Sequence, residues 1–123
     1  MDSSAAPDPF QQAADVQAAL GDAHRLHLLM LLRARPACVC ELVELTPLSQ
    51  PAVSQHLKRL RSAALVQEQR RGRWMIYALS AALPPYVAAL LESLPEPPGT
   101  RELRRRPLAA SCAETSVRPG RSR

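Results

Sequence analysis

Apolar residues recur every three or four positions through the first third of the chain, a spacing typical of helices. The stripe over residues 9–20 predicts a first helix, and Gly21 is typical of a helix end. Two further helices are predicted over residues 22–34 and from 38 or 39 to 45, the first of them beginning at an aspartate that can cap it. Pro36 separates these two helices because proline disfavours a helical conformation in the residue before it.

A fourth helix is predicted over residues 49–63, and its two faces differ in character. Ser49 can cap it, and Pro51 falls in its first turn, where a missing N–H is tolerated. One face is apolar and is expected to be buried: Val53, Leu57, Leu60 and Ala64. The other face is polar and basic: Gln50, Ser54, Gln55, Lys58 and Arg61.

After this helix the apolar pattern changes to one typical of strands. Residues 65–69 and 74–79 are predicted to be two strands, joined by a turn over 70–73 in which Gly72 permits an unusual backbone angle. A last helix is predicted from 84 or 85 to 94. The predicted fold class is mainly α with a small β-hairpin, which is the winged helix-turn-helix arrangement.

Composition divides the chain into three parts. Residues 1–8 are small and polar and are expected to be loose, whereas residues 9–95 have the periodicity of a single folded domain. Three prolines and a glycine over 95–99 end that domain. The remaining residues, 96–123, are rich in Arg and Pro without helical periodicity, and we expect them to be mostly disordered.

Basic residues concentrate over residues 56–73, where six lysines and arginines stand against Glu68 alone. Such a strip is typical of a protein that binds a polyanion, and an ordinary solvated surface is the open alternative. No secretory signal is visible, and the longest strongly apolar run, 28–32, is too short to span a bilayer. The three cysteines are therefore expected to be reduced thiols, and the protein is expected to be cytoplasmic, with no membrane partner.

The order of these elements predicts that the chain binds double-stranded DNA. A short helix, a tight turn and a polar second helix can place the second helix in a major groove. The amides of Gln50 and Gln55 can pair with an adenine edge, and Ser54 is a smaller contact. Lys58 and Arg61 are expected to hold phosphates, and Arg71 and Arg73 can enter a minor groove or contact the backbone. Two further candidates are Ser49 and the ambiguous His56, for which packing is an equally open role.

Three segments closely resemble the ArsR/SmtB family of metal-responsive bacterial repressors. They read ALGDAHRL at 19–26, LSQPAVSQHLK at 48–58 and RGRW at 71–74, and the resemblance covers about residues 10–94. It implies a homodimeric winged helix that binds an operator, with the first and last helices paired across the two-fold axis. One departure is Ala64, where the family usually has glycine; if a positive φ is needed, alanine costs up to ~1 kcal/mol.

Cys38 and Cys40 flank one residue where the short third helix begins. Inside a helix, side chains two residues apart are rotated by roughly 200°, but at the N-terminus both sulfurs can turn to one point. Two small buried side chains are the alternative reading. The segment CVCEL at 38–42 resembles the inducer site of arsenite-responsive members, which implies As(III) or Sb(III) as inducer and no organic cofactor. The third cysteine of some members is Val43 here, so Cys112 is a candidate third ligand.

Other functions remain open at this stage. Zinc or cadmium regulation is disfavoured because residues 1–20 lack the cysteines and histidines that the resemblance would require, although His24 and His27 can form half a site. The cysteine pair can instead be a redox switch that is closed by oxidation. A small thiol reductase is the remote alternative, but no nucleophile–base pair is apparent, and we expect the protein not to be an enzyme.

Overall fold

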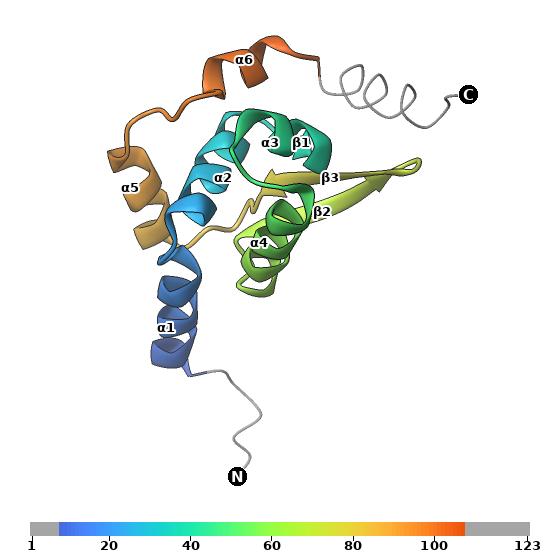
Figure 1. Cartoon of the computed structure of the whole chain (residues 1–123). Helices are drawn as coiled ribbons and strands as arrows, with labels where there is room; N and C mark the ends of the chain where they lie inside the picture. Colours follow the sequence, from blue (N-terminus) through green and yellow to red (C-terminus); the bar gives the residue numbers. More distant parts are fainter. Residues whose placement is uncertain (1–7, 108–123) are drawn as a thin grey trace, which may run out of the picture.

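The computed structural model describes residues 8–107, and Figure 1 shows how their elements are arranged. Within that range the helices and strands follow in this order: α1 Pro9–Leu20, α2 Ala23–Ala34, β1 Ala37–Cys38, α3 Val39–Leu45, α4 Gln50–Ser62, β2 Val66–Arg71, β3 Trp74–Leu79, α5 Pro85–Ser93 and α6 Thr100–Arg105. The strands form one antiparallel sheet in the order β1-β3-β2. The predicted winged helix-turn-helix fold is confirmed.

Side-chain caps fix the starts of three helices. The carboxylate of Asp8 accepts the N–H of Phe10 at 3.0 Å, and that of Asp22 accepts the N–H of His24 at 2.8 Å. The hydroxyl of Ser49 accepts the N–H of Ala52 at 3.3 Å, which starts α4. The caps predicted at positions 22 and 49 are therefore confirmed, and each satisfies a backbone donor that the helix itself leaves free.

A core of leucines holds the helix-turn-helix in place. Leucines of α2, α3, α4 and the position just before β2 are completely buried and lie in one cluster: Leu28, Leu29, Leu31, Leu42, Leu57, Leu60 and Leu65. The elements α3 and α4 pack on each other and α4 packs on α2. The buried face of α4 thus fixes which side of that helix is turned to solvent.

The end of α4 has the geometry of a Schellman motif, with alanine at the left-handed position. The N–H of Ala64 bonds to the carbonyl of Arg61 at 2.9 Å, and the N–H of Leu65 bonds to that of Leu60 at 3.0 Å. Ala64 has φ of 61°, within the region that favours glycine. The positive φ considered for this position is therefore confirmed.

The sheet has one strand more than the predicted hairpin. Ala37 and Cys38 pair with Tyr77 and Ile76 of β3. A two-residue strand is too short to show the alternation of apolar and polar residues, so only the pairing with β3 identifies it.

The expectation of disorder from residue 96 onward is wrong for the part that the structure describes. The helix α6 follows Gly99 and lies across α2, above the rest of the domain in Figure 1. Leu103 of α6 is completely buried. A helix of six residues buries too few side chains to show periodicity, so the apolar pattern of the sequence does not predict α6.

Some expectations fall on residues that the structure does not describe. These residues are 1–7, from the segment 1–8 that was expected to be loose, and 108–123 of the predicted tail, with Cys112 among them. Among residues 8–107, no helix is both long and apolar enough to cross a membrane.

Candidate functional site

The polar face of α4 is exposed along its length. Val53, Leu57 and Leu60 point into the core with no exposed surface, because they recur at the spacing of one helical face. The residues predicted on the other face are all exposed, and so is the capping residue: Ser49, Gln50, Ser54, Gln55, Lys58 and Arg61. Side-chain amides and two cations therefore lie on one accessible surface of a helix whose other face is packed in the core.

The β2–β3 hairpin, hereafter the wing, projects away from the helices in Figure 1. Its tip carries Arg70, Arg71 and Arg73, and all three are exposed. Gly72 between them has φ of 62°, which makes the tight turn accessible without steric strain. The tip thus concentrates positive charge on an extension of the fold.

Arg61 has a partner within the protein. Its Nε lies 2.6 Å from Oε2 of Glu68 on β2, in a salt bridge that is half exposed on the Arg61 side. Glu68 in turn lies opposite Tyr77 in the sheet. The pKa of Tyr77 is raised, mainly because the side chain is partly buried and secondly because the negative charge of Glu68 lies nearby. The salt bridge joins α4 to the wing, so Arg61 is placed to set their relative orientation.

His56 lies on the half-buried side of α4. Its Nδ1 is 3.3 Å from Nη1 of Arg25, and its ring centroid is 6.1 Å from that of His24. Arg25 also donates from Nε to the carbonyl of Ala19 at 2.6 Å. These contacts connect α4 to the junction of α1 and α2, and they favour the packing role of His56 over a DNA contact.

Cys38 and Cys40 are joined in a disulfide, and their Cα atoms lie 5.4 Å apart. The expectation that these cysteines are reduced thiols is therefore wrong for this structure. Cys38 is the N-cap of α3, with an extended backbone at φ −89° and ψ 166°, so its side chain is free of the helical rotation. Both sulfurs meet at one point, as the sequence predicted for a pair at a helix N-terminus.

The pair lies against β3, the second strand of the wing. Cys38 and Ile76 are buried together, and Cys40 and Trp74 pack against them. Trp74 begins β3 and pairs with Arg71 across the wing. The cysteines thus contact both the helix that supports α4 and the strand that carries the wing.

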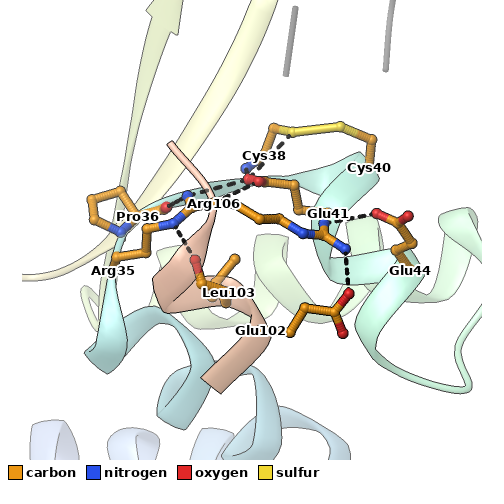
Figure 2. A network of polar contacts seen from close by, with 9 residues as sticks. All are labelled: Arg35, Pro36, Cys38, Cys40, Glu41, Glu44, Glu102, Leu103 and Arg106. Carbon is orange, nitrogen blue, oxygen red and sulfur yellow. Dashed lines mark hydrogen bonds and ion pairs between the residues drawn. A yellow bond between two sulfur atoms is a disulfide. The ribbon is translucent and has the colours of Figure 1, made fainter. Parts of the chain in front are cut away.

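A buried carboxylate beneath the cysteines was missed at the sequence level. Glu41 has no exposed surface, and its Oε1 accepts the N–H of Cys38 at 3.2 Å. Its Oε2 lies 2.6 Å from Nη2 of Arg35, as Figure 2 shows. The signal was present in the sequence, because a glutamate three residues after a helix cap is half of a capping box.

The described residues offer a two-sulfur site rather than a complete metal cage. No group of three or more His, Cys, Asp or Glu side chains within residues 8–107 is arranged to hold a metal ion. His27 is one of the two histidines considered above for half of a zinc site. Its Nε2 instead lies 3.2 Å from the carbonyl oxygen of Pro98. Joined in a disulfide, the two sulfurs are not thiolate ligands; only after reduction would they offer two soft donors of the kind that thiophilic ions prefer.

Comparisons with known proteins agree with this geometry. Residues 22–68 match the family model described as bacterial regulatory protein, arsR family. The chain is 39% identical over 66 residues to the arsenic resistance transcriptional regulator ArsR1 of Pseudomonas putida, covering 54% of this chain and 52% of that protein. It is 37% identical over 79 residues to ArsR2 of the same organism, covering 63% and 69%. The match therefore spans about half the length of the first relative and two thirds of the second.

A solved structure extends the likeness to the fold. HlyU from Vibrio cholerae is 31% identical, with a TM-score of 0.61, and the match covers 71% of this chain and 91% of that one. The residues matched by the family model, 22–68, contain α3 and α4, the helix that carries the exposed polar face.

Proposed function

Because the chain belongs to the arsR family of bacterial regulatory proteins, we propose that it is a transcriptional repressor that binds operator DNA as a homodimer. The observation that carries the proposal is the exposed polar face of α4 beside the arginine-bearing wing. A family of regulators gives no support to the thiol reductase alternative. Since a bacterial regulator acts where the chromosome lies, a cytoplasmic location is part of the proposal.

The proposed contacts divide by chemistry. Gln50 and Gln55 read base edges in the major groove, where an amide can make two hydrogen bonds to adenine, and Ser54 adds a less selective contact. Lys58, Arg61 and the cap residue Ser49 bind phosphates. They set affinity and register without reading sequence.

The wing supplies the outer contacts. Arg71 and Arg73 are exposed at its tip and bear charge that a narrow minor groove or the phosphate backbone attracts. Two such units, related by a two-fold axis, would read the two halves of a near-palindromic operator.

Support for a homodimer comes from exposed aromatic residues on α1 and α5. Phe10 is 84% exposed and Tyr86 is 44% exposed, whereas large apolar side chains elsewhere in residues 8–107 are buried or half-buried. In Figure 1 these two helices lie on the side of the molecule away from the wing. Pairing of α1 and α5 across a two-fold axis would cover both aromatic rings and leave the α4 surfaces free for DNA.

The proposed inducer is As(III) or Sb(III), bound by Cys38 and Cys40. Two cellular thiols first reduce the disulfide: they give up two electrons and two protons, become joined in a disulfide of their own, and leave Cys38 and Cys40 as two thiols. Each thiol then forms one As–S bond with arsenous acid as one As–OH bond breaks, and its proton leaves in the released water. A third ligand can come from Cys112 or a small cellular thiol.

Binding of the inducer can affect the proposed DNA-binding surface of the protein through two sets of contacts. The helix α3, which begins at the cysteines, packs on α4, and Cys38 pairs with Ile76 in the strand that forms the wing. Release from DNA requires that the inducer favour the weaker-binding conformation by a few kcal/mol. The name of the arsenic resistance relatives supports this choice of inducer.

Thiol oxidation is the second candidate signal, and the disulfide itself favours it. In this case oxidation of the two thiols to the disulfide, with loss of two electrons and two protons to peroxide, replaces metalloid binding. The same two sets of contacts would then change the affinity for DNA.

A mobility-shift titration on the DNA upstream of the protein's own gene tests the proposal. Reduced protein is expected to shift this DNA, and arsenite or antimonite is expected to release it. Cys38→Ser is expected to bind DNA equally well but to resist release. Zinc, cadmium and peroxide run in parallel, and release by one of these alone would contradict the metalloid assignment. Absence of any shift would contradict the repressor.

A further inference from the structure

The segment from Gly99 to Arg106, hereafter the C-terminal cap, is attached to α2 and to α3, the helix at whose start the cysteines lie. Leu103 is completely buried and Thr100 is 2% exposed. Gly99, at φ of 91°, brings the backbone so close to α3 that a Cβ there would lie 3.2 Å from the Cβ of Leu45. The cap is therefore a packed part of the fold.

Arg35 connects the cap to the buried carboxylate of Glu41. Its Nε donates to the carbonyl of Leu103 at 2.8 Å, and its Nη2 lies 2.6 Å from Oε2 of Glu41. Another hydrogen bond runs from Nη1 to the carbonyl of Pro36. The Arg35 side chain is only 13% exposed, so these bonds are largely shielded from water.

Glu41 continues this connection to the cysteines. Its Oε1 accepts the backbone N–H of Cys38 and lies 3.8 Å from the Cys38 sulfur. Figure 2 shows the sequence of contacts from the Leu103 carbonyl through Arg35 and Glu41 to Cys38. Loss of one member of a buried ion pair destabilises the position of the other. The contact of Arg35 with the Leu103 carbonyl and the contact of Glu41 with Cys38 therefore depend on each other.

Arg106 makes a second attachment between the cap and α3. Its two Nη atoms lie 2.8 Å from Glu44 and 3.0 Å from Glu102. Burial lowers the pKa of Arg106, but the hydrogen bonds to the two glutamates outweigh burial and raise it. Arg106 therefore holds the cap to the same helix from which Glu41 contacts Cys38.

We propose that Arg35 and Glu41 are positioning residues of the cysteine pair and that the C-terminal cap holds them in place. This inference rests on the cysteine pair being the regulatory site of the proposed function. The docked cap and the closed disulfide stabilise each other. Since such coupling is reciprocal, opening the pair loosens the cap, and loosening the cap makes the disulfide easier to reduce.

Hydrogen exchange of the full chain tests the first direction. The disulfide is reduced with dithiothreitol, which gives up two electrons and two protons and becomes a cyclic disulfide. Amides of residues 100–106 are expected to exchange about fivefold faster or more after reduction, while those of α1 are unchanged. Equal rates in the cap before and after reduction would overturn the proposal. A uniform rise in all helices would do so too.

The reverse direction is tested by a redox titration. It measures the ratio of reduced to oxidised dithiothreitol at which the disulfide is reduced in half of the molecules. Arg106→Ala is expected to lower this ratio about fivefold. The matched control is Arg104→Ala in α6, which removes an exposed salt bridge to Glu96, a residue that precedes this helix, and is expected to have no effect. Arg35→Lys is the second variant, because an ammonium cannot replace the planar fork that bridges Glu41 and Leu103.

An unchanged ratio in both Arg106→Ala and Arg35→Lys would overturn the coupling. Neither measurement uses DNA or a metalloid. Failure of the repressor proposal would instead appear as a missing mobility shift in the wild-type protein, so the two failures are distinguishable.

Discussion

Cys38 lies opposite Ile76 in the β1–β3 register, so the cysteine that caps α3 is also part of the sheet that forms the wing. The two side chains are buried together, with Trp74 packed beside them. A change of state at one sulfur therefore reaches both α3 and the wing through direct contacts. The short strand β1, invisible in the sequence pattern, creates the second of these routes.

Trp74 is expected to report the state of the pair, since it is the only tryptophan of the chain and packs against the cysteine cluster. A neighbouring disulfide quenches indole emission, so reduction should raise the fluorescence of Trp74. Arsenite added to the reduced protein should then change it in a saturable manner. Cys38→Ser should remove both responses, and an unaltered response in that variant would place the reporter elsewhere.

Gln55 and Lys58 are expected to differ in how their loss affects DNA binding. Gln55→Ala should cost about 1–3 kcal/mol on the operator and relax the preference at one base pair. Lys58→Ala should weaken binding to all sequences alike and reduce the dependence of log K on log salt by about one. Titrations on operator and scrambled DNA at several salt concentrations separate these effects. A sequence-selective loss in the lysine variant would contradict its phosphate role.

Ala64→Gly is expected to stabilise the fold. At φ of 61° an alanine is strained by about 1–2 kcal/mol, and glycine removes this strain. Part of the gain in stability is offset because glycine has greater backbone freedom in the unfolded chain. A net increase of about 0.5–1 kcal/mol in the free energy of unfolding should follow, measured by denaturant titration. Its neighbour Ala63 has φ of −89°, so Ala63→Gly is the matched control and should destabilise. Destabilisation by both changes would contradict the strain at position 64.

Asp22 is expected to make stability depend on pH in the acid range. The N–H of Arg25 bonds to its carboxylate and, despite an opposing effect of burial, lowers its pKa below the ordinary value of 3.8. A lowered pKa in the folded state stabilises the fold above the unfolded pKa, and this stabilisation is lost as pH falls through the folded value.

Two variants isolate this contribution. Asp22→Ala should cost about 1 kcal/mol at pH 7, because it leaves the first backbone donors of α2 without an acceptor. Asp22→Asn should retain most of the cap but flatten the acid limb of the stability profile, as measured by denaturant unfolding between pH 7 and pH 3. An unchanged acid limb in the asparagine variant would assign the pH dependence to other carboxylates.

Local chemistry along the chain was enough to predict most of the helix-turn-helix. The N-caps at Asp22 and Ser49 and the apolar spacing of α4 each depend on residues within one or two turns. The same spacing predicted which side of α4 is exposed. These features need no distant contact, so they can be read from a single sequence.

Contacts between distant segments decided the rest. The strand β1 exists because β3 pairs with it, and α6 is ordered because Leu103 is buried on α2 and its carbonyl accepts a bond from Arg35, 68 residues away. Neither segment is long enough to carry a periodic pattern of its own. The polar face was determined by the sequence alone, whereas the surroundings of the cysteines became visible only when the chain was folded, because burial and pairing of short segments depend on partners far away in the sequence.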